Sequence, residues 1–157
     1  MRLTYLLIKR YLIALGVGAV VLTADLLTKR LAAVEFAGNP VEVIPGFFGF
    51  TYVENFGSAF GFFQDGGRVV AIAAMLVTVV VIGAIAIERQ VFETVILGLV
   101  LGGAIGNLVD RFARGDGLLD GGVIDWIELW FIPTFNLADA SVTVAVGLLL
   151  LRSWQTR

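Results

Sequence analysis

The sequence predicts an integral membrane protein that is mainly α-helical, with four transmembrane helices in a single membrane domain spanning residues 1–157. Two features of the composition support this prediction. Hydrophobic residues make up 59% of the chain and charged residues 15%, and the mean hydropathy is +0.94. An ordinary soluble domain is about 45–50% apolar and about 25% charged. The apolar excess is gathered into long runs, which indicates that lipid is the solvent.

The first apolar run follows a basic start and gives the first predicted helix. It is longer than the hydrophobic region of a cleavable signal peptide, which has about 7–15 residues. It also lacks a convincing small-x-small cleavage site, so we expect a retained membrane helix. The predicted helices cover residues of about 11–28, 69–87, 91–110 and 135–151. In the third, Gly98, Gly102 and Gly106 share one face, which predicts close packing against another helix.

Two longer connections separate these helices, over residues of about 29–67 and 111–134. The first contains two predicted strands, Val41–Ile44 and Phe47–Glu54, on either side of a Pro-Gly turn. It is also rich in aromatic residues, for which we consider two interpretations. They form an interfacial belt or small core, or they form a partly apolar platform for a lipid or peptide. The second connection is rich in glycine and predicts a flexible loop.

The chain contains no Cys and no His. This excludes disulfides, thiol nucleophiles, Ser-His and Cys-His catalysis, and the usual zinc sites. The net charge of −2 gives no support to nucleic-acid binding. We expect neither a metal nor a cofactor. Any chemistry must therefore use carboxylates, hydroxyls, Lys or Arg.

Acidic residues gather at one side of the predicted membrane domain. Helices joined in series alternate in direction, so this side holds Asp25, Asp110, Asp125 and Asp139. A charged side chain at membrane depth costs about 2.5–3.5 kcal/mol on insertion scales, which makes such a group a functional-site hypothesis. The basic residues before the first helix favour cytoplasmic termini, although the charge bias is slight. We therefore expect the acids to face outward.

Two carboxylates suffice to cleave a peptide bond. One, ionised, takes a proton from the attacking water, and the other, protonated, hydrogen-bonds the carbonyl oxygen. Asp125 is suited to this role because it lies in an apolar setting. Asp139 lies at the start of the fourth helix with Asn136 three residues earlier, and an N-terminal cap is the alternative interpretation.

Other polar residues near this side have structural interpretations. We expect Asp110 and Arg111 to form an ion pair that closes the third helix, with Asn107 bonding between helices. Lys29 with Ser58 weakly suggests a Ser-Lys hydrolase, but a Lys just beyond a spanning helix usually extends to the membrane surface.

Five motifs occur in order along the chain: Asp25 with Lys29, NFGSAFG at 55–61, GNLVDR at 106–111, VIDW at 123–126 and FNLAD at 135–139. Together they resemble the bacterial lipoprotein signal peptidases, also called signal peptidase II or prolipoprotein signal peptidase. The resemblance implies an aspartyl protease with four transmembrane helices, a small extracytoplasmic β-sheet and a mobile loop. It also implies cleavage of diacylglyceryl-modified prolipoproteins just before the lipidated cysteine.

The resemblance also implies roles for individual residues. Asp125 and Asp139 correspond to the catalytic pair. Asn55, Asn107, Arg111 and Asn136 correspond to residues that bind substrate or support the pair, and Asp25 and Asp110 to structural acids. The interval from Asp110 to Asp125 is longer than in the family pattern, so Asp120 is an alternative partner, but the Val-Ile before Asp125 and the Trp after it favour Asp125.

The implied partners are the prolipoprotein substrate and membrane lipid, and we expect a monomer in the bacterial plasma membrane. Two other functions remain open. A proton-coupled transporter would distribute its acids through the membrane depth, and a structural subunit would tolerate loss of Asp125 and Asp139.

Overall fold

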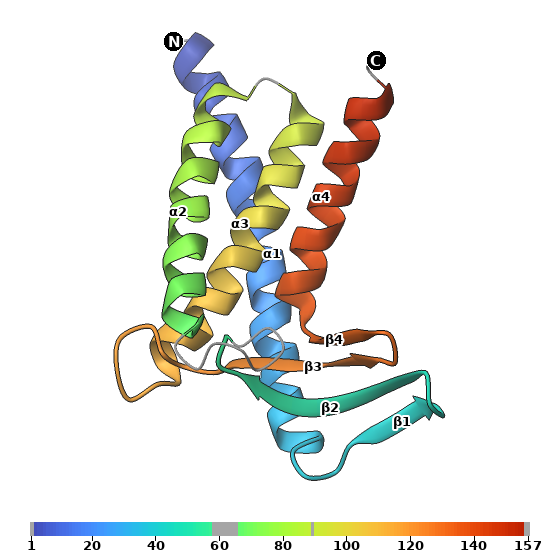
Figure 1. The fold of residues 1–157 in the computed structure, drawn as a ribbon. Coiled ribbons are helices and arrows are strands. Elements are labelled where there is room, and N and C mark those ends of the chain that lie inside the picture. Colours follow the sequence, from blue (N-terminus) through green and yellow to red (C-terminus); the bar gives the residue numbers. More distant parts are fainter. Residues whose placement is uncertain (1, 58–65, 89, 156–157) are drawn as a thin grey trace.

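The computed structural model describes residues 2–57, 66–88 and 90–155, and in it a bundle of helices stands on a small sheet (Figure 1). The elements of the described chain are α1 (Arg2–Glu35), β1 (Val41–Ile44), β2 (Phe48–Asn55), α2 (Gly66–Ile87), α3 (Val91–Ala113), β3 (Val123–Leu129), β4 (Ile132–Phe135) and α4 (Leu137–Gln155). All four helices of the described chain are long and apolar enough to cross a membrane. The predicted fold class is confirmed.

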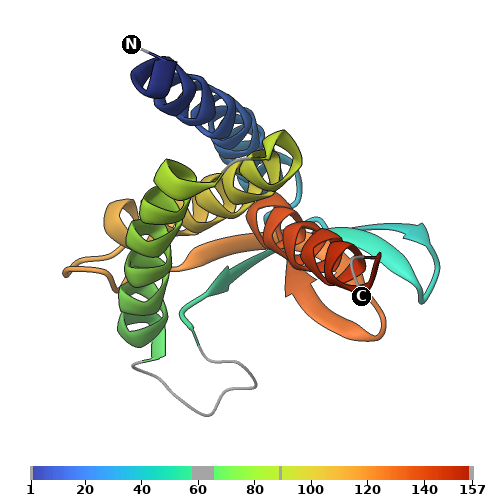
Figure 2. The same ribbon diagram turned by 90° about the horizontal axis from the view of Figure 1, so that it is seen from above.

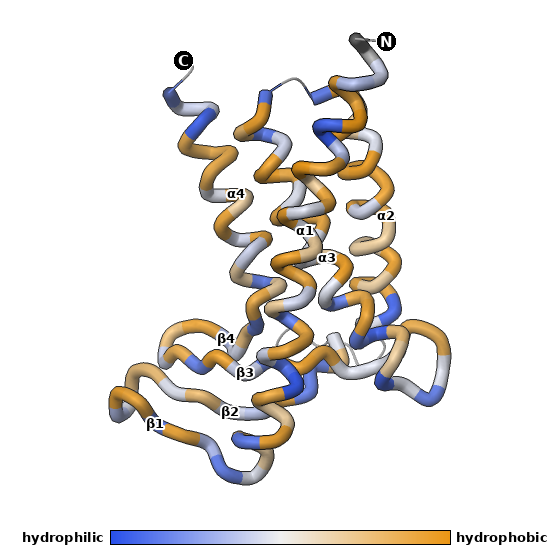
Figure 3. The backbone as a smooth tube through the Cα atoms, turned by 180° about the vertical axis from the view of Figure 1, so that it is seen from behind, coloured by the Kyte–Doolittle hydropathy of each residue, from blue (hydrophilic) through white to orange (hydrophobic). Residues whose placement is uncertain are grey.

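The helices differ from the predicted ranges mainly in α1. This helix has 34 residues, or about 51 Å at 1.5 Å per residue, which exceeds the roughly 30 Å hydrocarbon core. Helix α1 continues past the apolar run to Glu35, and within this extension Lys29 lies inside the protein and pairs with Asp25 one turn earlier. Figure 3 shows hydrophobic residues along the middle of the helices and hydrophilic residues toward their ends.

Helix α3 is central, with α1, α2 and α4 packed around it (Figure 2). The predicted glycine seam lies between α1 and α3. A Cβ added at Gly98 would lie 2.7 Å from the Ala14 carbonyl oxygen, and one at Gly102 would lie 2.6 Å from that of Gly18. Because real Cβ atoms do not approach so closely, small residues allow these backbones to meet.

The sheet has the strand order β1-β2-β3-β4, and neighbouring strands are antiparallel. The predicted strands β1 and β2 are confirmed. Strands β3 and β4 lie in the segment expected to be a flexible loop, so that expectation is wrong for residues 123–134. The glycines of this segment all lie before β3. Strand β3 itself has the sequence VIDWIEL, which is rich in the β-branched and aromatic residues that favour strands. Phe135, predicted to begin the fourth helix, instead ends β4.

Aromatic rings form a cluster on the sheet around Phe50. Three rings lie at centroid distances of 5.1–5.6 Å from it: Phe36, Phe48 and Trp126. Trp130 and Phe131, in the β3–β4 turn, are exposed. The sheet therefore has both a small aromatic core and an apolar outer surface, so both interpretations of the aromatic segment stay open. Three of its phenylalanines lie outside the described residues: Phe60, Phe62 and Phe63.

Candidate active site

Asp125 lies in β3 and is only 3% exposed. Both of its carboxylate oxygens accept hydrogen bonds from asparagine side chains. Asn55 Nδ2 donates to Oδ2 at 3.0 Å, and Asn136 Nδ2 donates to Oδ1 at 2.7 Å. Asn55 ends β2, which pairs with β3, and Asn136 directly precedes α4. The sheet and the start of α4 thus fix the orientation of this carboxylate together.

Burial raises the pKa of Asp125 to about 6, because its surroundings disfavour the ionised carboxylate. The hydrogen bond from Asn55 acts in the opposite direction, since it stabilises the charged form. The negative charge of Asp139 also contributes to this rise. Asp125 therefore binds and releases its proton near pH 6, well above the range of an ordinary aspartic acid.

Asp139 lies in the first turn of α4. Its backbone N–H donates to Asn136 Oδ1 at 3.0 Å, and the Asn136 N–H donates to Asp139 Oδ2 at 3.4 Å. This reciprocal pair of hydrogen bonds is a capping box. Asn136 and Asp139 therefore cap the N-terminus of α4, as the alternative interpretation predicted. The cap leaves Asp139 Oδ1 available, and Asn107 Nδ2 donates to it at 2.7 Å. Capping and a position in the polar site are therefore compatible.

The amides of Asn107 and Asn136 connect the two carboxylates. Asn136 Nδ2, which contacts Asp125, also lies 3.2 Å from Asn107 Oδ1. Asn107 comes from α3 and Asn136 from the start of α4, so the link joins two helices to the sheet. The predicted bonding of Asn107 between helices is confirmed.

Lys29 lies beneath this link and is completely buried. Its ammonium group lies 2.7 Å from Asp25 Oδ2 and 2.9 Å from Asp110 Oδ2, and it donates to Asn107 Oδ1 at 2.9 Å. The expectation that Lys29 extends to the membrane surface is wrong. Two carboxylates compensate its charge inside the protein, as burial of an ammonium requires. Asp25 also accepts the Ala138 N–H at 2.9 Å and so anchors α4.

The expected ion pair between Asp110 and Arg111 is not formed. Asp110 pairs with Lys29 and, at 2.8 Å, with Arg114 one turn later. Successive helical residues point in different directions, so Arg111 instead donates to the Gly121 carbonyl oxygen at 2.8 Å. The Gly121 N–H returns a bond to the Arg111 carbonyl. Arg111 therefore fastens the loop that leads into β3.

A cavity of about 280 Å³ lies at the sheet end of the bundle. Asp125 and Asp139 both line it, together with three further residues of the predicted site: Asn55, Asn107 and Arg111. Helix α2 contributes an apolar side through Val70, Ala71 and Ala74. The volume is close to the lower end of the range for ligand cavities, about 300–1,000 Å³. The arrangement combines an acidic pair, amide donors and an apolar flank.

Asp120, the alternative partner, lies away from this arrangement. It accepts the Gly117 N–H at 3.1 Å and pairs with the exposed Arg68 at 3.3 Å. It is not among the described residues that line the cavity. Ser58, considered with Lys29 as a hydrolase pair, lies outside the described residues.

Sequence reasoning missed the contribution of Gly57. Its N–H donates to Asn55 Oδ1 at 2.9 Å, which leaves Asn55 Nδ2 directed at Asp125. Gly57 has φ of 90°, a backbone conformation that glycine adopts without strain. The Asn-Phe-Gly sequence is typical of an Asx turn, so the signal was present.

Comparison with known proteins gives consistent results. The family described as "Signal peptidase (SPase) II" matches residues 17–155. A lipoprotein signal peptidase of Symbiobacterium thermophilum is 44% identical over 142 residues, covering 88% of this chain and 91% of the relative. A lipoprotein signal peptidase of Mycobacterium leprae is 40% identical over 150 residues, covering 92% of this chain and 73% of the relative.

A bacterial membrane enzyme solved at 2.3 Å by the in meso method has a similar structure. The TM-score is 0.76 at 28% sequence identity, and the likeness covers 90% of this chain and 87% of that one. The matched region includes every residue of the polar network described above. This multi-pass membrane chain therefore belongs to the signal peptidase II family.

Proposed function

We propose that this protein is an aspartic endopeptidase that removes the signal peptide from diacylglyceryl-modified prolipoproteins. It cleaves just before the lipidated cysteine, as the family resemblance implies. The observation that supports this most directly is that Asp125 and Asp139 line one cavity and are linked through the same two amides. The described relatives are named lipoprotein signal peptidases.

The proposed reaction uses the two carboxylates with one proton between them. The ionised carboxylate takes a proton from water as the water oxygen bonds to the scissile carbonyl carbon. The protonated carboxyl donates a hydrogen bond to the carbonyl oxygen and stabilises the tetrahedral intermediate. When the intermediate collapses, the C–N bond breaks and the leaving amine takes a proton from the pair.

We assign the shared proton to Asp125 in the resting site. Its burial raises its pKa to about 6, which favours the neutral form relative to an ordinary aspartic acid. The side-chain amides of Asn55 and Asn136 each donate a hydrogen bond to one of the two carboxylate oxygens of Asp125. The carboxyl proton would then be directed toward the cavity.

The remaining site residues have positioning roles in this proposal. Asn107 and Asn136 hold the two acids, and Asn55 and Arg111 line the cavity where they would meet the substrate backbone. Asp25 and Asp110 balance the charge of Lys29 beneath the site. These acids therefore support the fold and do not take part in proton transfer.

The apolar side of the cavity suits a lipid-modified substrate. Val70, Ala71 and Ala74 belong to α2, which has an exposed apolar outer surface, so acyl chains could approach from the bilayer along this helix. Contacts with the acyl chains would supply binding energy that orients the peptide. We expect peptides without the diacylglyceryl group to be poor substrates.

The proposed setting is the bacterial plasma membrane, with cytoplasmic termini and the site near the outer face. The enzyme acts as a monomer, with the prolipoprotein and surrounding lipid as its partners. Gathering of the four acids at one end of the bundle suits a protease better than a proton relay through the membrane.

The direct test is a gel-shift cleavage assay with a diacylglyceryl-modified prolipoprotein in detergent or lipid. The parent chain is compared with Asp125→Asn and Asp139→Asn, and with Asp116→Asn as a control at an exposed acid outside the cavity lining. We expect cleavage by the parent and the control and none by either site variant. Full turnover by Asp139→Asn would contradict the catalytic pair, and an inactive folded parent would contradict the proposed activity.

A further inference from the structure

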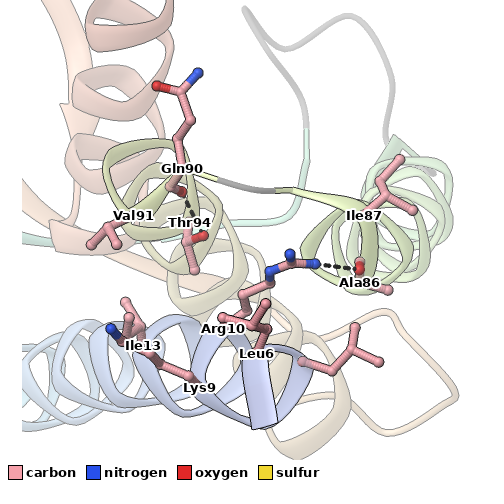
Figure 4. Close-up of a pocket in the computed structure, with 10 residues that line it drawn as sticks. Leu6, Lys9, Arg10, Ile13, Ala86, Ile87, Gln90, Val91 and Thr94 are labelled. Carbon is pink, nitrogen blue, oxygen red and sulfur yellow. Dashed lines mark hydrogen bonds between the residues drawn. The ribbon is translucent and has the colours of Figure 1, made fainter. Parts of the chain in front are cut away.

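A second, larger cavity (Figure 4) lies at the opposite end of the bundle from the sheet, the end at which both chain termini lie (Figure 1). Its volume is about 780 Å³. It lies between the first turns of α1, the end of α2 and the start of α3. Its walls are mostly apolar side chains, namely Leu6, Leu7, Ile13, Ile87 and Val91. The proposed protease function uses no residue of this cavity.

The charged groups of this cavity are both cations. Lys9 and Arg10 line it, and the described residues of its lining include no carboxylate. Arg10 donates one N–H to the Ala86 carbonyl oxygen at 2.9 Å, and its other donors have no partner among the described residues. Lys9 is exposed, and the described part of the chain gives it no partner either.

The neighbouring acids are engaged elsewhere. Glu93 pairs with Arg152 at 3.2 Å, and Glu88 Oε1 accepts the Gln90 N–H at 2.9 Å. Neither acid lies among the described lining residues. The described lining of the cavity therefore presents two cations, and no carboxylate, beside an apolar surface.

We propose that this cavity binds an anionic phospholipid of the surrounding leaflet. The phosphate would lie at Arg10, with Lys9 as a second cation at the rim, and an acyl chain would contact the apolar walls. Arginine donors suit phosphate oxygens, and basic residues at the end of a membrane helix attract anionic headgroups. A soluble anion would leave the apolar walls without a partner.

Two hydrogen bonds join α1 and α2 beside the cavity. One turn further into the bundle, the Tyr11 hydroxyl donates to the Ile82 carbonyl oxygen at 3.0 Å, so α1 and α2 are joined there. The hydrogen bonds of Arg10 and Tyr11 therefore join α1 to two successive turns of α2. A bound lipid would therefore lie at the open end, with its chain directed into the bilayer.

The test is native mass spectrometry of the full chain in detergent, titrated with phosphatidylglycerol and with phosphatidylcholine of the same acyl chains. We expect tighter binding of phosphatidylglycerol. Lys9→Gln and Arg10→Gln should each weaken that binding by about fivefold, the contribution of one basic residue near an anionic lipid surface. The matched control is Arg30→Gln, an exposed cation near the other end of α1, which should leave binding unchanged.

Two controls keep the test decisive. If Arg10→Gln disturbs the packing of the helices, Arg10→Lys serves in its place because it keeps the positive charge. Lys9→Gln changes an exposed side chain that has no partner in the described structure, so it should not affect folding. Glycerol phosphate without acyl chains should not bind. Equal binding of both lipids, equal losses in Arg30→Gln and Lys9→Gln, or equally tight binding of glycerol phosphate would overturn the proposal. Because binding is measured without cleavage, the result is independent of the proposed protease activity.

Discussion

Asn107 Nδ2 donates to Asp139 Oδ1 at 2.7 Å, and Asn107 Oδ1 accepts from the buried Lys29 at 2.9 Å. The ammonium group can only donate, so it fixes which end of the Asn107 amide faces the acid. The ion cluster of α1 and α3 thus determines the hydrogen bonding of a carboxylate on α4. A residue outside the cavity lining therefore controls the geometry of the candidate active site.

Replacing Lys29 should destabilise the protein strongly. In Lys29→Met, Asp25 loses its cation and Asp110 keeps only its pair with Arg114, and loss of one partner from a buried ion pair costs about 3–5 kcal/mol. We expect a corresponding fall in the free energy of unfolding, measured by tryptophan fluorescence in detergent. Lys9→Met, at an exposed cation of the same helix, is the control and should change little.

The interpretation of the Lys29 cluster has its own check. In an Asp25→Asn background one of the two acids is already neutral, so the further cost of Lys29→Met should be smaller. The new amide oxygen can still accept the Ala138 N–H. An undiminished cost in that background would mean that lost packing, and not lost charge compensation, dominates.

The rate of cleavage should fall as the pH rises above about 6. The pKa of Asp125 is raised to about 6 by burial, so the carboxyl is protonated below this pH and loses its proton above it. If Asp125 donates to the carbonyl oxygen, kcat/KM falls by about tenfold per pH unit on the alkaline side. A profile measured between pH 4.5 and 8 with lipidated substrate tests this, and a flat profile up to pH 8 would exclude the assignment.

The Asn55 hydrogen bond gives a directional test of the same assignment. This bond lowers the pKa of Asp125, because it stabilises the ionised form. Asn55→Ala should therefore shift the alkaline limb to higher pH, in addition to any loss of rate. Asp116→Asn, at an exposed acid outside the cavity lining, should leave the limb in place. A shift to lower pH in Asn55→Ala would contradict the role of the bond.

Much of the site could be predicted from the order of elements along the chain. Alternating helices place Asp25, Asp110 and Asp139 at the same end, and the apolar residues beside Asp125 indicate its burial. The sequence does not show which partner a polar side chain selects, because that depends on helix rotation. Arg111 therefore binds the Gly121 carbonyl while Lys29 takes Asp110.

Strands β3 and β4 illustrate a second limit. The glycines before β3 suggested a loop, but β2 provides a neighbouring strand, in which Glu54 and Asn55 lie opposite Ile124 and Val123. Strand formation depends on such a neighbouring strand more than on local preference. The same pairing brings Asn55 to Asp125, so the missed strand is what completes the site.

The glycine seam should tolerate no added methyl group. In Gly102→Ala the Cβ would lie 2.6 Å from the Gly18 carbonyl oxygen and 2.7 Å from Val21 Cβ, so α1 and α3 must separate. Overpacking of this kind typically costs about 1–3 kcal/mol. Gly16→Ala is the matched control because no atom lies within 4 Å of its added Cβ. Thermal unfolding in detergent should show a lower midpoint for Gly102→Ala only, and equal midpoints would contradict the close packing.

The proposed orientation can be tested with introduced cysteines, since the chain has none. Asp116→Cys lies in the loop before β3, and Gln155→Cys ends α4 at the opposite end of the bundle; both residues are exposed. With cytoplasmic termini, a membrane-impermeant maleimide added to intact cells should label Asp116→Cys and should label Gln155→Cys only after permeabilisation. The reverse pattern would place the candidate active site on the cytoplasmic side. Because the charge bias between the two sides is slight, this measurement decides the orientation more directly than the positive-inside rule.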